Sequence, residues 1–148
     1  MSASPGEPEV VRVERVLPAD RETVFAAWTQ PERMAGWFSP RGSAEVEAEV
    51  VVGGRLRVAM IEGDVRIDHD GEFLEVDPPE RLVFTWRSPY TGDRPSVVTI
   101  ELFDDHGSTR IVLTHRGLPA EERSSHAGGW GAILDRLGTT VIGTGVGD

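Results

Sequence analysis

The stretch Ser124–Val141, "SSHAGGWGAILDRLGTTV", has the pattern of a long helix near the end of the chain. Apolar residues recur in it at helical spacing and form one stripe: Trp130, Leu134, Leu137 and Val141. The same stretch contains Gly128, Gly129 and Gly131, and each glycine costs a helix about 1 kcal/mol relative to alanine. Glycines at these places either let the backbone approach another element closely or keep space open beneath the helix.

Upstream of this helix, the hydrophobic pattern predicts a sheet and two short helices. Residues 9–17 alternate as a strand does, and two short helices follow, the first with Asp20 as its N-cap and the second with Pro31 in its first turn. Residues 44–115 then show period-two alternation separated by turns, with a change of phase at residues 71–74 that predicts a bulge. Strands segregated from helices indicate an α+β fold, in which the last helix covers one face of a curved antiparallel sheet.

The bulk composition suggests one domain and excludes several kinds of chemistry. A chain of 148 residues suits a single domain, which we expect at residues 10–141, between a disordered segment (1–9) and a flexible tail (142–148). The absence of cysteine excludes disulfides and thiolate chemistry, and the absence of lysine excludes a Schiff base. The net charge of −10 argues against nucleic acid or an anionic membrane as a partner. No apolar run approaches the ~20 residues of a membrane span, so we expect a cytoplasmic protein.

Three groups of residues carry a resemblance to a known family. They are Trp28, Pro31 and Trp37; then Gly71, the run Asp77-Pro78-Pro79-Glu80-Arg81-Leu82 and Trp86; then His126, Gly129, Trp130, Leu134 and Leu137. Over about residues 10–141 the chain resembles the Hsp-90 ATPase activator homologue (Aha-type) family of the START/Bet v-like SRPBCC superfamily. The resemblance implies a helix-grip fold: a curved antiparallel sheet of six to seven strands around a long C-terminal helix, with two short helices after the first strand. It also implies a cavity between sheet and helix, with the three glycines at the crossing or at the cavity mouth.

The candidate binding residues are the large apolar and aromatic side chains that such a cavity would share with the core. They are Trp37, Phe38, Met60, Phe73, Trp86, Tyr90, His115, Trp130 and Leu134. In a helix-grip protein the core and the cavity wall form one surface, so this pattern does not separate wall residues from core residues. We expect Tyr90, His115 or an arginine to orient the ligand near the mouth of the cavity.

No catalytic or metal site is expected. The four histidines have no serine or acid partner at a recognised spacing, and we interpret His69 as an exposed strand residue. If one histidine acts as an acid or base, the most plausible is His115, at the end of a strand near the cavity edge. The run around Asp68 and Asp70 superficially resembles a calcium-binding loop, but Arg66 occupies the position of the first ligand, so we expect neither a metal nor a cofactor.

Three functions remain open at this point. The first is binding or sequestration of a small hydrophobic or aromatic molecule, lipid-like or polyketide-like, and the absence of a catalytic constellation favours it. The second is an enzyme of the cyclase or hydrolase type, which requires an ionisable group in the cavity. The third, suggested by the family name, is a chaperone-associated regulator of the stress response, with a chaperone as partner. The sequence leaves a homodimer open as well.

Overall fold

The computed structural model of this chain describes residues 10–91 and 95–145, with side chains described as far as residue 141. The expected disordered segment, residues 1–9, therefore lies outside the described residues, as do residues 146–148 of the expected tail. The last helix runs to Gly145, beyond the expected end of the domain at residue 141.

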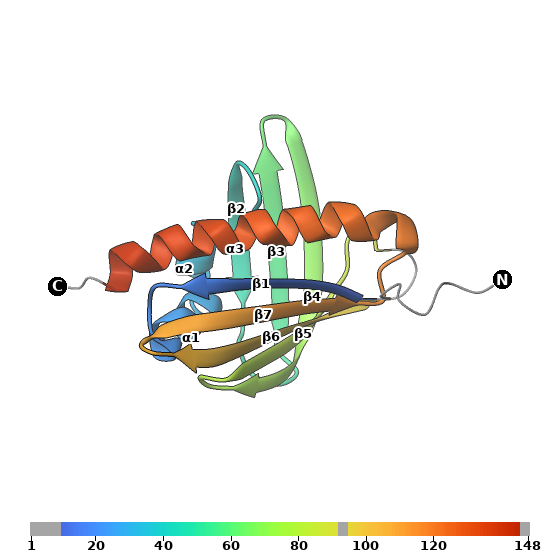
Figure 1. The fold of residues 1–148 in the computed structure, drawn as a ribbon. Helices are drawn as coiled ribbons and strands as arrows, with labels where there is room; N and C mark the ends of the chain where they lie inside the picture. The colour runs from blue at the N-terminus through green and yellow to red at the C-terminus, as the bar shows by residue number, and fades with distance from the viewer. Residues whose placement is uncertain (1–9, 92–94, 146–148) are drawn as a thin grey trace.

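Seven antiparallel strands form one sheet in the order β1-β7-β6-β5-β4-β3-β2 (Figure 1). The strands are β1 (Val10–Leu17), β2 (Ser43–Ala48), β3 (Arg55–Glu62), β4 (Val65–Asp77), β5 (Arg81–Trp86), β6 (Ser96–Asp105) and β7 (Ser108–Arg116). The helical elements are α1 (Arg21–Thr29), α2 (Pro31–Met34), the short 3-10 turn η1 (Ala120–Glu122) and α3 (Arg123–Gly145). This is the α+β helix-grip fold that the sequence predicts, with two short helices after the first strand.

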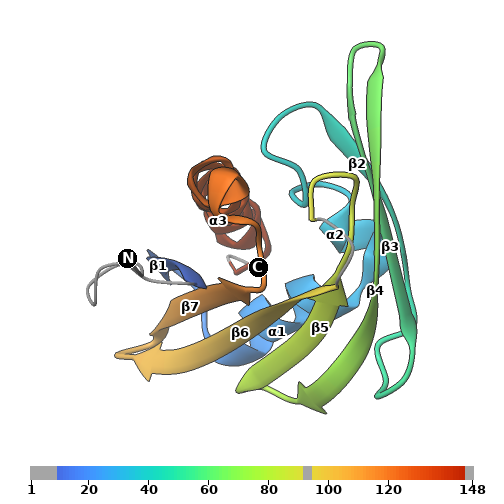
Figure 2. The ribbon, with the colours of Figure 1, turned by 90° about the vertical axis from the view of Figure 1, so that its right-hand side faces the viewer.

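The sheet bends so strongly that its two halves face α3 in different ways. Figure 2 shows α3 lying over β1 and β7, while β2, β3 and β4 rise on the other side of the helix. The predicted bulge is confirmed by a register shift in β4 between Phe73 and Glu75. A side chain at Gly71 would collide with the carbonyl oxygen of Thr85, so glycine is required where β4 approaches β5.

Local signals in the sequence account for the ends of several elements. The carboxylate of Asp20 accepts a hydrogen bond from the backbone N–H of Thr23 at 2.8 Å, which confirms the predicted N-cap of α1. The β6–β7 hairpin turns at His106 and Gly107, both with positive φ, as a tight two-residue turn requires. Among the described residues, no helix has both the length and the apolar character needed to cross a membrane.

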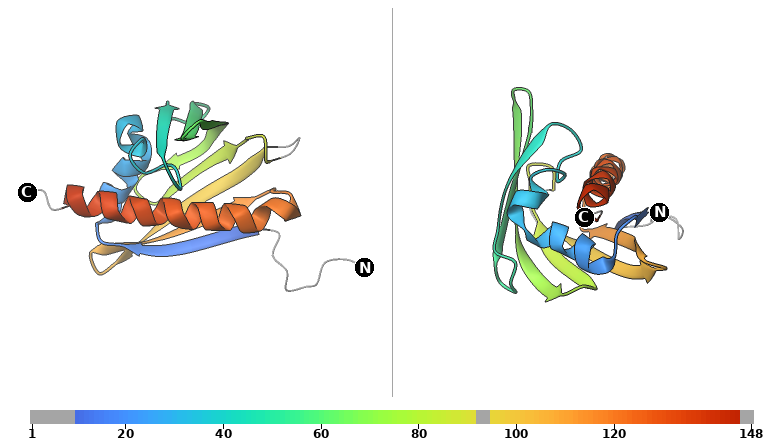
Figure 3. Two further views of the ribbon diagram at one scale, coloured as in Figure 1. Left: turned by 90° about the horizontal axis from the view of Figure 1, so that it is seen from above. Right: turned by 90° about the vertical axis from the view of Figure 1, so that its left-hand side faces the viewer.

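The hydrophobic core lies between the sheet, α1 and α3. The apolar stripe of α3 is buried there as predicted: Trp130, Leu134, Leu137 and Val141 are at most 3% exposed. Figure 3 shows α1 and α2 on the same side of the sheet as α3, at the end where the C-terminus lies. Helix α1 adds Val24, Phe25 and Trp28 to this core, so one end of the sheet is closed by helices.

Candidate functional site

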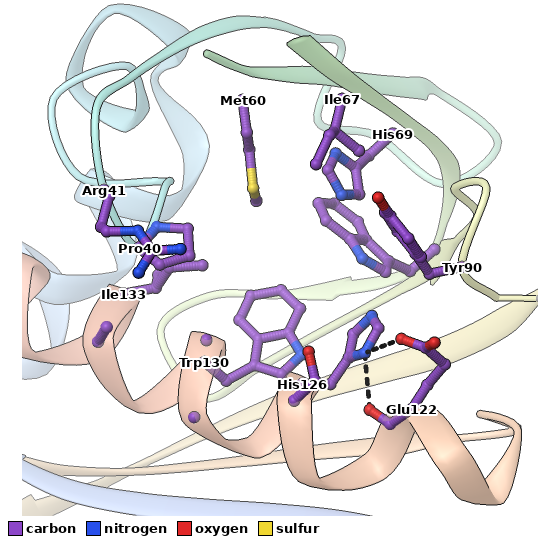
Figure 4. A pocket seen from close by; sticks show the side chains of 15 residues that line it. Pro40, Arg41, Met60, Ile67, His69, Tyr90, Glu122, His126, Trp130 and Ile133 are labelled. Carbon is purple, nitrogen blue, oxygen red and sulfur yellow. Dashed lines mark hydrogen bonds and ion pairs between the residues drawn. The ribbon is translucent and has the colours of Figure 1, made fainter. Parts of the chain in front are cut away.

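A cleft of about 710 Å³ lies on the side of α3 that faces the rising half of the sheet (Figure 4). Its lining comes from the loop before β2, from β3, β4 and β5, from the loop after β5, and from η1 and α3. The lining residues are Pro40, Arg41, Met60, Ile67, His69, Trp86, Tyr90, Glu122, Ser125, His126, Gly128, Gly129, Trp130, Ala132 and Ile133. The cleft thus combines an apolar wall with a small group of polar side chains, the composition typical of a small-molecule site.

The structure separates the nine predicted binding residues into two groups. Four of them line the cleft: Met60, Trp86, Tyr90 and Trp130. The other five are at most 1% exposed and lie in the core away from the cleft lining: Trp37, Phe38, Phe73, His115 and Leu134. These five come from the segment after α2, from β4 and β7, and from α3.

Aromatic rings in the core support the cleft wall from behind. His69 stacks on Trp86 with ring centroids 4.6 Å apart. Trp86 stacks in turn on Phe38 at 5.5 Å, and Phe38 on Trp37 at 5.2 Å, both with nearly parallel planes. Although Phe38 and Trp37 do not line the cleft, their contacts hold the Trp86 ring in one orientation.

A buried chain of hydrogen bonds joins the two tryptophans of the cleft through His115. The Nε1–H of Trp130 donates to Nδ1 of His115 at 2.9 Å, which places the proton of a neutral His115 on Nε2. That Nε2–H donates to Oγ of Ser96 at 2.7 Å, and the Ser96 hydroxyl donates to the carbonyl oxygen of Trp86 at 2.6 Å. Each polar group in this series of hydrogen bonds therefore has a partner, as burial demands.

Burial also keeps His115 uncharged. The pKa of His115 is lowered to about 3, mainly because burial removes hydration from the charged form and in smaller part because His126 lies nearby. The expectation that His115 reaches the cavity edge is wrong, because its side chain is 0% exposed and both ring nitrogens are used inside the core. Its place in the structure is that of a residue that positions Trp130.

His126 and Glu122 form a polar pair inside the cleft that the sequence analysis did not select. Nδ1 of His126 lies 2.9 Å from the backbone oxygen of Glu122 and 3.8 Å from its carboxylate. Figure 4 shows the other ring nitrogen, Nε2, pointing away from Glu122 toward the side of the cleft that holds His69 and Tyr90. The available signal was the spacing of four residues from Glu122 to His126 and again to Trp130, which places all three on one side of a helix.

The interpretation of His69 as an exposed strand residue is wrong. His69 is 8% exposed, and its Nδ1 lies 3.2 Å from the backbone oxygen of Val58 on the neighbouring strand. Burial lowers the pKa of His69 and keeps its imidazole neutral. The signal was present in the alternation Ile67, His69, Gly71, Phe73, which places His69 on the inner face in spite of its acidic neighbours.

The glycines of α3 have different neighbours. A Cβ atom at Gly128 would meet no described atom within 4 Å, and one at Gly129 would meet only Pro40, at 3.7 Å. Both glycines line the cleft, so the expectation that they face the cavity is confirmed for these two positions. Gly131 instead faces β1, where a Cβ atom would lie 2.9 Å from the guanidinium of Arg15.

The rim of the cleft is polar and exposed. Arg41 pairs with Glu62 at 3.2 Å, with 77% of the arginine side chain exposed. Tyr90 is 48% exposed, and its ring points into the cleft from the loop after β5. Within residues 10–91 and 95–145, no group of three or more histidine or acidic side chains is arranged to hold a metal ion.

Comparisons with known proteins agree with this architecture. The sequence profile of a family described as "Activator of Hsp90 ATPase homolog 1-like protein" matches residues 18–141. The human protein "Activator of 90 kDa heat shock protein ATPase homolog 1" is 29% identical over 110 residues, which make up 74% of this chain and 30% of the human protein. The chain thus spans less than a third of the length of that relative.

Two solved structures are also similar. Protein CV1439 from Chromobacterium violaceum is 26% identical, with a TM-score of 0.78 over 89% of this chain and 96% of that one. DynU16, a protein in the dynemicin biosynthetic locus, is 27% identical, with a TM-score of 0.76 over 92% of this chain and 48% of that one.

Proposed function

The chain belongs to the Activator of Hsp90 ATPase homolog 1-like family, and we propose that it binds a small hydrophobic or aromatic molecule in the cleft between the sheet and α3. The helix-grip fold of this family is consistent with a hydrophobic ligand-binding domain. The whole proposal depends on one observation: a cleft of about 710 Å³ with two tryptophans in its lining. A volume of this size lies in the range of small-molecule sites, roughly 300–1,000 Å³.

Affinity in this cleft would come mainly from apolar contact. Met60, Ile67, Trp86, Trp130 and Ile133 supply the apolar lining. Each Å² of apolar surface removed from water contributes about 25 cal/mol before the costs of association. Since aromatic stacking behind Trp86 and the hydrogen bond to Trp130 fix both indoles, a bound ring would meet a preorganised surface.

Native mass spectrometry of the purified full chain, followed by fluorescence titration with naphthalene derivatives, tests this proposal. The variant Gly128→Leu places a side chain in the open space of the cleft and is expected to weaken probe binding at least tenfold. Ser124→Leu is the matched control, because Ser124 is exposed on α3 and does not line the cleft. If the probes bind neither the wild type nor the control, or bind Gly128→Leu equally well, the proposal fails.

A second candidate function is association with a chaperone, favoured by the 29% identity to the human activator of the 90 kDa heat shock protein ATPase. That identity covers only 30% of the human protein, so the matched part alone would have to act on the chaperone. Adding the full chain to a purified 90 kDa heat shock protein and following ATP hydrolysis tests this. A concentration-dependent change in the ATPase rate supports it; an unchanged rate at saturating chain concentration excludes it.

The cyclase or hydrolase alternative requires an ionisable group in the cleft, which is lined by Glu122 and by the imidazoles of His69 and the more exposed His126. The imidazole of His126 lies in the cleft, but within the described part of the chain no hydroxyl group is hydrogen-bonded to it as a nucleophile would be. The binding function requires only the cleft, whereas the catalytic alternative also requires a nucleophile. The binding function is therefore better supported.

A further inference from the structure

We propose that the cleft selects an aromatic molecule that carries a hydroxyl group, a phenol, and that Nε2 of His126 accepts the hydrogen bond of that hydroxyl. The inference rests on the proposed binding function and adds the chemical class of the ligand. It follows from the tautomer of His126, from the polar groups around it and from the shape of the apolar wall.

The proton of neutral His126 is on Nδ1. The nearest group to Nδ1 is the backbone oxygen of Glu122, at 2.9 Å, and a carbonyl oxygen can only accept a hydrogen bond. The carboxylate of Glu122, at 3.8 Å, also favours a proton on the same nitrogen, because it attracts the partial positive charge of the N–H hydrogen. Nε2 therefore presents a lone pair to the cleft, and no group in the described part of the chain donates to it.

Glu122 and His69 likewise offer no hydrogen-bond donor to the cleft, whereas the hydroxyl groups of Tyr90 and Ser125 can both donate and accept. The carboxylate of Glu122 has no proton to donate when ionised. Nδ1 of His69 lies 3.2 Å from the backbone oxygen of Val58, and the backbone of Ile67 is a second partner of the ring, so the proton of neutral His69 is used on backbone oxygens. The charged donor of the lining, Arg41, lies at the exposed rim and is paired with Glu62. A ligand that donates a hydrogen bond is thus complementary to the part of the cleft around His126, whereas a carboxylate placed there would face the lone pair of Nε2 and the like charge of Glu122.

The apolar wall fits a flat ring next to this acceptor. Trp86 and Trp130 are in contact, with ring centroids 5.4 Å apart and planes inclined by 52°, so together they form one angled aromatic surface. Figure 4 shows Met60 pointing from β3 toward α3 and the ring of Tyr90 pointing across from the loop after β5. Aromatic edges and a thioether around a flat ring are favourable contacts beyond their area.

The test compares three probes that share a naphthalene ring: 2-naphthol, 2-methoxynaphthalene and 2-naphthoate. Binding to the full chain is followed by quenching of tryptophan fluorescence at about pH 8, where an imidazole is neutral. We expect 2-naphthol to bind about 3- to 10-fold more tightly than 2-methoxynaphthalene, which lacks the donor. We expect 2-naphthoate to bind more weakly than either.

Two variants of His126 identify the group responsible. His126→Asn keeps an amide within reach of the Glu122 carbonyl but has no atom at the Nε2 position, so the ratio of the two affinities should fall to about one. His126→Gln places an amide near the Nε2 position and should retain part of the preference for 2-naphthol over 2-methoxynaphthalene. A merely structural role of His126 would not predict this partial retention. Ser124→Ala, outside the cleft, should bind all three probes as the wild type does.

The outcomes separate this inference from the binding function. Equal wild-type affinities for 2-naphthol and 2-methoxynaphthalene, or tighter binding of 2-naphthoate, overturn the phenol inference and leave the binding function standing. A preference for 2-naphthol that survives in His126→Asn overturns the role of His126. Failure of all three probes to bind overturns the binding function itself.

Discussion

Helix α3 packs tightly on one side and leaves space on the other. On the packed side, Leu134 and Leu137 are 0% exposed in the core, and toward β1 a Cβ atom at Gly138 would lie 3.4 Å from the side chain of Leu17. On the side of β3 and β4, the same helix borders a cleft of about 710 Å³, and a Cβ atom at Gly128 would meet no described atom within 4 Å. Strands of the same sheet lie on both sides of α3. The bend of that sheet therefore determines which side of the helix is packed and which side is open.

This contrast shows how one helix can hold the fold together and border a binding site as well. Burial against β1 stabilises the position of α3, so the opposite side does not need to be filled. The His115 chain of hydrogen bonds lies at the boundary between the two sides, because it links Trp130 on α3 to the backbone of Trp86.

The largest effect is expected from emptying the tightly packed side. Leu137→Ala removes a fully buried side chain and should lower the free energy of unfolding by about 2–5 kcal/mol. The matched change on the open side, Met60→Ala, should cost about 1 kcal/mol or less, because Met60 is only partly buried at the cleft. Denaturant titrations of both variants measure the difference. Similar losses would mean that the cleft side packs as tightly as the β1 side.

Acid should destabilise the folded chain through His115, which lies between the packed and the open side of α3. The pKa of His115 is about 3 in the folded chain and about 6.5 in an unfolded one, so between these values only the unfolded chain binds the proton. The stabilisation is fully present above about pH 6.5 and is lost as pH falls toward 3; from pH 7 to pH 5 we expect a loss of about 2 kcal/mol. The lowered pKa of His69 acts in the same direction.

Denaturant titrations at several pH values measure this slope. The variant His115→Gln cannot titrate, so its stability should depend less steeply on pH, with the part due to His69 remaining. Equal slopes in wild type and variant would contradict the assignment of His115 as a neutral buried histidine.

A smaller effect should distinguish the glycines of the two sides. Gly128→Ala adds a methyl group to open space and should stabilise the chain by about 0.5–1 kcal/mol through helix propensity. At Gly131 the same change must displace the guanidinium of Arg15, which bonds to Asp135 at 2.9 Å, so the gain should be smaller. Thermal unfolding of both variants tests the order. A larger gain at Gly131 would contradict the assignment of the open side.

The smallest effect is expected at the exposed edge of the tightly packed side. Asp135→Asn removes the ion pair with Arg15, whose two side chains are 39% and 66% exposed, and should cost about 0.5 kcal/mol or less. High salt should reduce the difference from wild type, because it screens exposed charges. A cost that exceeds that of Met60→Ala, or one that salt does not change, would show that this pair is shielded from solvent.

The alternation of apolar and polar residues along the strands correctly predicts which side chains point inward. It does not predict which of these side chains line the cleft and which are packed in the core. It predicts that Leu82, Phe84 and Trp86 share one face of a strand, and all three are buried. Of these, Trp86 alone lines the cleft, and it is the last residue of β5. His69 was misinterpreted from its acidic neighbours, although its phase in β4 matches that of Phe73.

The sequence by itself determined the order of elements, the inward-facing residues, the N-cap at Asp20 and the long C-terminal helix, because these depend on neighbours close in the chain. Only the tertiary structure decided which inward-facing residues line the cleft, and that His126 and not His115 has a free ring nitrogen there. Both outcomes depend on the bend of a seven-stranded sheet and on its distance from α3. That distance is set by contacts between residues far apart in the chain, which no local pattern of the sequence records.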